Sequence, residues 1–213
     1  REGAVFNQKA PGLYYYVDNK FLKLRYIFLD CCDVPFEHNE DGSLKYMPQG
    51  FYSYSQSQLD WLAEEALCFD EDGWTVVVFQ HVPTKVNYKT GERYDRVHNL
   101  HDILLARREN AKCNAVYNEG ELHTEVNTDF STYKKCDIAA VFVGHIHTDS
   151  ELVEDGIHYI STANSVMYMS DPNIKRTDGD KTELLMDVIT INTDKRTVNL
   201  TRVGAGEDRS FNY

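Results

Sequence analysis

The sequence IAAVFVGHIH, at residues 138–147, carries the strongest structural signal in this chain. Its six apolar residues predict a buried strand, and Gly144 then interrupts the run. The imidazoles of His145 and His147 therefore follow the carboxyl end of a core strand. Open α/β sheets bind their ligands at this end of their strands. The sequence thus predicts an α/β fold and also the edge of the sheet at which its chemistry takes place.

A second apolar run ends in the same way. WTVVVFQ, at residues 74–80, predicts another core strand, and it leads directly into His81 and Pro83. A single histidine at a strand end is usually an ordinary hydrogen-bonded residue. Two histidines two residues apart after a glycine, together with a third at another strand end, instead indicate metal ligands.

The remaining elements follow from periodicity and capping residues. Ser55 and Ser57 offer capping positions for a helix, and Ser57 begins a sequence of the capping-box form. The other expected elements are a hairpin at 14–17 and 24–29, a helix from residue 99, and strands at 157–161, 185–193 and 197–203. Polar loops are expected at 31–54, 84–97 and 113–130, and we expect them to shape a substrate entrance.

Composition limits the range of functions. A chain of 213 residues can bury one substantial core, so one domain is expected. A net charge of −12 argues against nucleic acid or an anionic membrane as a general partner. No apolar run approaches the roughly 18 residues that a membrane span requires. The five cysteines form no Cys-x-x-Cys pair, which predicts reduced thiols and a cytoplasmic protein.

These motifs together resemble the calcineurin-like metallophosphoesterase family. Besides the three histidines, the resemblance includes a strand that ends at Asp30, the sequence QLDWL at 58–62, and RVGAGEDR at 202–209. The last of these is similar to the ends of bacterial and phage-like members. The resemblance implies a layered β-sandwich flanked by helices, an αββα arrangement. It also implies metal-dependent hydrolysis of small phosphomonoesters or phosphodiesters.

The resemblance further implies two divalent transition-metal ions, which could be Mn, Fe, Zn or Ni. It assigns His81 and His145 to one ion and His147 to the other. The family's N-terminal motifs, Asp-x-His, Gly-Asp and Gly-Asn-His, do not occur ahead of His81. Residues 1–213 are therefore expected to be the C-terminal part of one phosphoesterase domain, incomplete at its N-terminus. Such a chain would have no catalytic residue of its own and would bind metal weakly or not at all. The missing N-terminal strands would leave an apolar surface of the sheet exposed, and a homodimer would cover that surface.

Other classes of site fit the sequence less well. A His-x-His-x-His transferase would need histidine at position 149, which is Asp149. That aspartate is interpreted as a polar loop residue, with an outer-shell metal role as the alternative. A serine hydrolase or a phosphate-binding loop would show glycine motifs that are absent. The remaining alternative is a non-catalytic scaffold that retains the fold. The other histidines are interpreted as ordinary polar residues: His38, His98, His101, His123 and His158.

Overall fold

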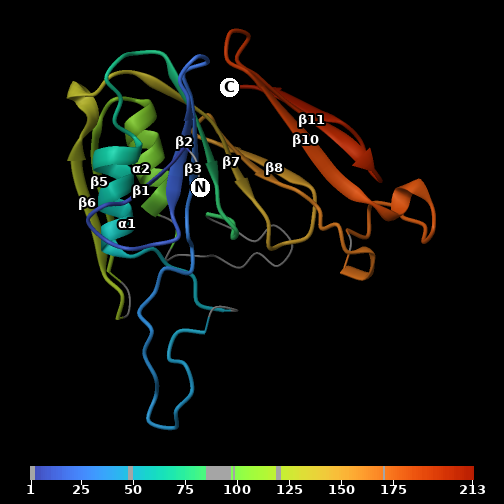
Figure 1. Cartoon of the computed structure of the whole chain (residues 1–213), viewed down its shortest axis with the longest axis horizontal. Coiled ribbons are helices and arrows are strands. Elements are labelled where there is room, and N and C mark those ends of the chain that lie inside the picture. Colours follow the sequence, from blue (N-terminus) through green and yellow to red (C-terminus); the bar gives the residue numbers. More distant parts are fainter. Residues whose placement is uncertain (1–2, 48–49, 85–96, 98, 119–120, 170) are drawn as a thin grey trace.

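A seven-stranded mixed sheet forms the centre of the molecule, in the order β1-β2-β3-β4-β7-β9-β8 (Figure 1). The computed structural model describes residues 3–47, 50–84, 97, 99–118, 121–169 and 171–213. Neighbouring strands run parallel from β3 through β4 and β7 to β9, and the outer pairs are antiparallel. The expectation of a mixed α/β fold is confirmed. The strands span Ala4–Phe6 (β1), Tyr15–Asn19 (β2), Leu24–Phe28 (β3), Trp74–Phe79 (β4), Cys136–Val143 (β7), Ser150–Glu154 (β8) and Ile157–Ser161 (β9).

The two central strands are the apolar runs that precede the histidines. Strands β4 and β7 are buried along almost their whole length, because the sheet is covered on both faces. Alternate residues of β4 pack into different layers: Val76 and Val78 belong to the cluster under the helices, and Val77 belongs to the cluster on the opposite face. Sequence reasoning identified both strands for this reason.

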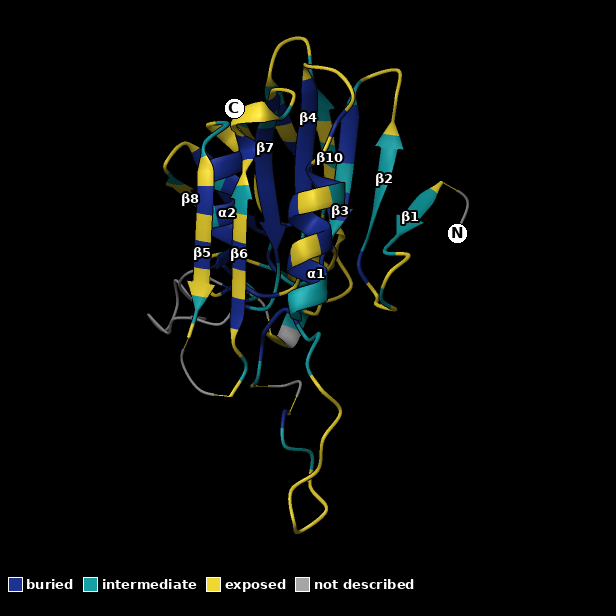
Figure 2. Ribbon diagram, turned by 90° about the vertical axis from the view of Figure 1, so that its left-hand side faces the viewer, coloured by how far each residue is buried: buried dark blue, intermediate teal, exposed yellow. Residues whose placement is uncertain are grey.

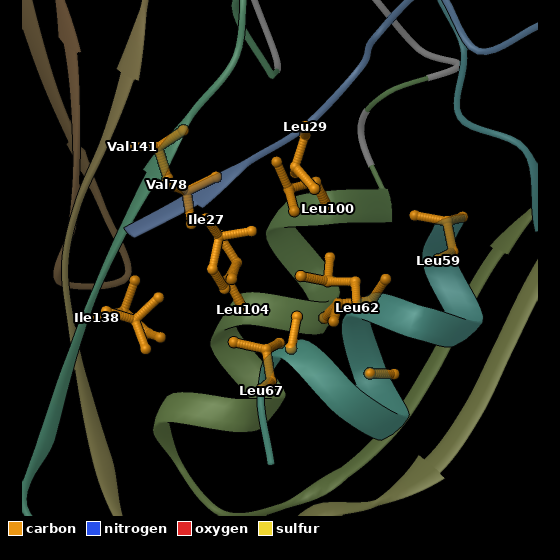
Figure 3. Close-up of a cluster of buried hydrophobic side chains, with 14 of the residues drawn as sticks. Ile27, Leu29, Leu59, Leu62, Leu67, Val78, Leu100, Leu104, Ile138 and Val141 are labelled. Carbon is orange, nitrogen blue, oxygen red and sulfur yellow. The ribbon is translucent and has the colours of Figure 1, made fainter. Parts of the chain in front are cut away.

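Helices cover one face of the sheet. Helix α1 spans Gln56–Trp61 and continues as a π-helical turn at Leu62–Ala66, and α2 spans Asn99–Arg108. The Ser55 side chain accepts the hydrogen bond of the Gln58 amide, so Ser55 rather than Ser57 caps α1. Leucines of both helices pack against aliphatic side chains of β3, β4 and β7 (Figure 3).

Two buried arginines terminate the first helical segment. Arg25 donates to the carbonyls of Ala66 and Cys68 at 2.8 and 3.2 Å, and Arg107 donates to that of Leu67 at 2.8 Å. Carbonyl groups at a helix end have no partner within the helix, and cationic donors there also complement the helix dipole. The first helical segment therefore ends through contacts made by distant residues.

The polar segment 113–130 is not the loop that its composition predicted. It contains a hairpin of β5, Lys112–Tyr117, and β6, Thr124–Asp129 (Figure 2). Cys113, Ala115 and Val126 point inward, and exposed residues alternate with them. Small apolar residues at every second position are enough to bury one face of a two-stranded sheet against α1 and α2.

A separate three-stranded sheet covers the other face of the central sheet (Figure 1). Val198 and Leu200 pack against side chains of β4 and β7, while Met186 and Val188 on the outer side are about half exposed. In the described part of the chain, α1 and α2 pack on the face of the central sheet that β10–β12 do not cover. The strands are Leu185–Asn192 (β10), Thr197–Gly204 (β11) and Arg209–Asn212 (β12).

An aromatic row crosses five neighbouring strands. Strand pairing aligns Phe6, Tyr15, Phe28, Phe79 and Phe142 side by side, with ring centroids 4.7 to 5.3 Å apart along the row. Only the last of these rings is fully buried, and the other four are half-buried. Cross-strand aromatic pairs stabilise a sheet, and here they also leave an apolar strip at its surface.

The remaining segments are short or irregular. Residues 31–47, which follow β3, project from the edge of the sheet as a long loop (Figure 1). No helix in the described part of the chain has the length and apolar character to cross a membrane. Single 3-10 turns occur at Phe130–Thr132, Met167–Met169 and Lys181–Glu183.

Candidate metal-binding site

Backbone hydrogen bonds continue to join β4 and β7 past the carboxyl ends of the two strands. The two strands are parallel neighbours in which Phe79 pairs with Phe142. The Gln80 amide then donates to the Phe142 carbonyl at 3.0 Å, and the Gly144 amide donates to the His81 carbonyl at 2.8 Å. The backbone therefore brings the residues after both strands to the same level of the sheet edge.

This arrangement places two of the three predicted ligands against each other. Nδ1 of His145 lies 3.2 Å from Nε2 of His81, and the two rings are nearly perpendicular at 84°. Two imidazole nitrogens that share a tetrahedral zinc ion, each about 2.0–2.1 Å from it, would lie roughly 3.3 Å apart. The observed separation therefore fits either a shared proton or a shared metal ion.

His147 lies outside this close pair. Among the described residues, the three histidines do not bring their ligand atoms within 4.8 Å of one another as a set. Both His145 and His147 have left-handed backbone conformations, with φ of 66° and 57°. Such a conformation costs a residue with a side chain roughly 1–2 kcal/mol. Ile146 between them is buried, whereas His145 and His147 are half-buried.

The electrostatics of the site favour neutral imidazole. Although His81 is exposed at the surface, the surrounding protein displaces part of the water that would stabilise its charged form, and this lowers its pKa; the nearby His147 adds positive charge and lowers it further. Metal ligation requires the unprotonated ring, so a lowered pKa keeps His81 in the form that can bind a cation.

Polar and aromatic side chains next to His81 and His145 hold these two residues in place. The Tyr54 hydroxyl donates to Oε1 of Gln80, whose amide nitrogen donates to the Val82 carbonyl at 2.7 Å and to the Thr84 hydroxyl at 3.0 Å. The ring of Tyr52 meets that of His145 edge-on, at 5.2 Å between centroids. These contacts fix the backbone on both sides of His81 and one face of His145.

The described residues contain one other group with metal-ligand chemistry, formed by His101, Glu154 and Asp155. The ring of His101 is 2% exposed; its Nδ1 lies 2.6 Å from the Tyr159 hydroxyl, and its Nε2 lies 3.1 Å from Oδ2 of Asp155. Arg108 also donates to the Asp155 carbonyl at 2.7 Å. Both nitrogens of His101 thus attach α2 to the β8–β9 hairpin, so we interpret the group as structural.

Several other predicted features are now located. A cavity of about 380 Å³ is lined by residues 33–35, 54–56 and 121–124, and none of the three site histidines borders it. Most of the predicted loop 84–97, together with His98, lies outside the described residues. A Gly-Asp pair does occur at residues 179–180, but it lies in an exposed turn far along the chain from β4.

Asp149 is more than the polar loop residue that its neighbours in sequence indicated. Its Oδ1 accepts the Ala163 amide at 2.8 Å, and its Oδ2 pairs with Arg202 at 2.7 Å. No local signal in the sequence relates these residues, since Arg202 follows Asp149 by 53 positions.

No protein-family model matches this chain, and no curated protein sequence matches it either.

Proposed function

We propose that His81, His145 and His147 bind divalent transition-metal ions and that the complete protein hydrolyses small phosphomonoesters or phosphodiesters. The observation that carries this proposal is the 3.2 Å approach of His81 and His145 at the adjoining ends of two buried parallel strands. Imidazole nitrogen suits Zn, Fe, Ni and Mn, so these are the candidate metals. In this assignment His147 serves the second ion.

The protein's own residues would supply position and charge. Metal ions in such a site act as Lewis acids and lower the pKa of bound water to about 7. His81 and His145 directly follow two neighbouring buried strands, so their nitrogens are held close together before a ligand binds. The three histidines do not bring their ligand atoms within 4.8 Å of one another as a set, which supports the assignment of His147 to a separate ion.

Two nitrogen ligands are too few for a stable site. Structural zinc ions take four protein ligands and catalytic ones three. The family motifs that would add carboxylates and a general acid do not occur ahead of His81. We therefore propose that the 213-residue chain binds metal weakly and is inactive by itself.

The proposal extends to the fold and the location. The face-to-face packing of β10–β12 on the central sheet supports a layered αββα sandwich in the complete protein. A cytoplasmic location is supported by the cysteines, which form no Cys-x-x-Cys pair. The polar loops around the sheet edge would contact the phosphoester.

Calorimetry with Zn²⁺ on the whole chain tests the ligand assignment. We expect weak binding that His81→Ala and His145→Ala each reduce at least about tenfold, in keeping with the loss of a metal ligand. The matched control is His123→Ala, because His123 is an exposed histidine that pairs only loosely with Glu125 at 3.9 Å. Equal loss of binding in the control, or no loss in the site variants, would contradict the assignment.

Hydrolysis of aryl phosphate mono- and diesters with added Mn²⁺ or Ni²⁺ tests the inactivity of this chain. We expect no turnover above the level of His81→Ala, because the two-metal clamp requires bridging carboxylates. Metal-dependent turnover that survives purification and disappears in His81→Ala would show that the chain is active without a preceding segment.

The absence of the same motifs favours a second candidate, a non-catalytic scaffold that keeps the fold. The coding sequence ahead of Arg1 separates the two candidates. Asp-x-His followed by Gly-Asn-His there would support the enzyme, and an open reading frame without them would support the scaffold.

A further inference from the structure

A buried cluster of charges joins the three-stranded sheet to the loop that carries His145 and His147. Arg202 on β11 donates from Nη2 to Oδ2 of Asp149 at 2.7 Å and from Nε to Oδ1 of Asp187 at 2.7 Å. Arg209 on β12 approaches the same two carboxylates, at 3.3 and 2.9 Å. Asp149 stands two residues after His147, so the second sheet holds this loop directly.

The cluster is paired and largely shielded from water. The side chains of Arg202 and Asp187 are 2% and 3% exposed, and those of Asp149 and Arg209 are about one fifth exposed. Two guanidinium groups face two carboxylates, so the charges of the four side chains balance. Removing one member of such a buried set leaves its partner's charge uncompensated, so the loss of a single member is destabilising.

Arg202 is the first residue of RVGAGEDR, at 202–209, the sequence that resembles the ends of bacterial and phage-like phosphoesterases. The Arg202 amide donates to Oδ1 of Asp208 at 2.7 Å, and Nη1 donates to the Ala205 carbonyl at 2.9 Å. Gly206 has φ of 98°, and a Cβ built there would lie 2.3 Å from Nη1 of Arg202. The glycine is therefore needed both for the turn and for the space that the guanidinium occupies.

The loop that this cluster holds is strained and fixed at both ends. Its two histidines have left-handed backbones, a conformation that persists only when the surrounding structure imposes it. On one side the Gly144 amide is bound to the His81 carbonyl at 2.8 Å. On the other side Asp149 accepts the Ala163 amide and pairs with Arg202.

We infer that Arg202 and Asp187 are positioning residues, which act through Asp149 to hold the His145–His147 loop in its metal-binding conformation. The metal-binding role of the loop rests on the proposed function, whereas the restraint of the loop by Arg202 and Asp187 does not. A ligand site needs its histidines to be oriented by such outer contacts, whose loss typically lowers metal affinity 10–100-fold.

Asp149→Asn in the whole 213-residue chain tests the inference, because it removes the charge and keeps the shape. Arg202→Lys is the second variant, since an ammonium group cannot bridge two carboxylates as a guanidinium does. The matched control is Asp137→Asn, which breaks the ion pair of Asp137 with Arg196 between the same two sheets, at the other end of β7. Amide hydrogen exchange and Zn²⁺ calorimetry are measured for all four proteins.

In both cluster variants we expect amide exchange at residues 145–149 to rise at least about tenfold and Zn²⁺ affinity to fall at least about tenfold. Exchange in β4 and in Asp137→Asn should match the wild type. Faster loop exchange in a chain that binds no Zn²⁺ at all would support the positioning role and count against the proposed function. Unchanged loop exchange in both cluster variants, with β4 still protected, would overturn the inference.

Discussion

At the residue scale, metal binding at the candidate site requires His81 in its unprotonated form. The pKa of His81 is lowered, first by desolvation and then by the charge of His147. The unfolded chain, with an ordinary pKa of about 6.5, therefore binds this proton more readily than the folded one. The contribution of His81 to stability is fully present above pH 6.5 or so, and it is lost as the pH falls through the lower pKa of the folded state.

We predict that His147→Ala raises the pKa of His81, because it removes the second of the two causes. The pKa should remain below its ordinary value, since the desolvation persists. A pH titration of the imidazole Cε1 protons by NMR measures this directly, with His123→Ala as the control. A pKa of His81 that does not move would mean that the charge of His147 has no effect on it.

The residue before His81 supports a second prediction. Gln80→Leu should lower the free energy of unfolding by about 1–3 kcal/mol, because it leaves the buried Tyr54 hydroxyl without an acceptor. Urea denaturation of Gln80→Leu, Tyr54→Phe and the double variant provides the measurement. The double variant should lose less than the sum of the single losses. Strict additivity would show that the two side chains do not interact.

At the element scale, buried cations connect the helical layer to the rest of the fold. Arg107 is fully buried and donates to the carbonyl of Leu67 and to that of Lys134, which precedes β7. It therefore connects three elements: α2, the end of the first helical segment and the approach to a core strand.

We predict that Arg107→Met destabilises the fold by about 2–4 kcal/mol, because Met fills the space but leaves two carbonyl groups without donors. Arg108→Met is the matched control on the next residue, since Arg108 makes only an exposed bond to the Asp155 carbonyl. The control should lose less than about 1 kcal/mol. Equal midpoints in thermal and urea denaturation for both variants would refute the prediction.

The same scale shows what can be predicted from sequence. Strands β4 and β7 were predicted because burial on both faces makes each a continuous apolar run. The β5–β6 hairpin was missed because its inward residues are small and its outward ones polar. The relative position of His81 and His145 followed from two parallel strand ends. The place of His147 depends on a left-handed backbone, and that of Asp149 on Arg202, and neither has a local signal.

At the scale of the whole molecule, the aromatic row places four half-buried rings, on β1, β2, β3 and β4, in one strip across the central sheet. Apolar strips of this kind favour association, and we predict that the chain forms a dimer through it. Light scattering over a dilution series should show a monomer–dimer equilibrium that Phe28→Glu shifts to monomer.

Val153→Glu is the control for this prediction, because Val153 is an exposed apolar residue on the edge strand β8, which does not carry the aromatic row. A wild-type chain that stays monomeric at every concentration would contradict the prediction. A dimer that both substitutions dissociate equally would place the interface elsewhere.

The position of β12 gives the molecule a defined response to mechanical force. Its last residue, Asn212, pairs with Thr197, and its first, Arg209, pairs with Leu200 and reaches Asp149 and Asp187. A pull on the C-terminus would therefore separate the β11–β12 pairs one at a time, beginning far from the histidines. The ion pairs of Arg209 with Asp149 and Asp187 would break last. The histidine loop would therefore keep its conformation until β12 had separated completely from β11.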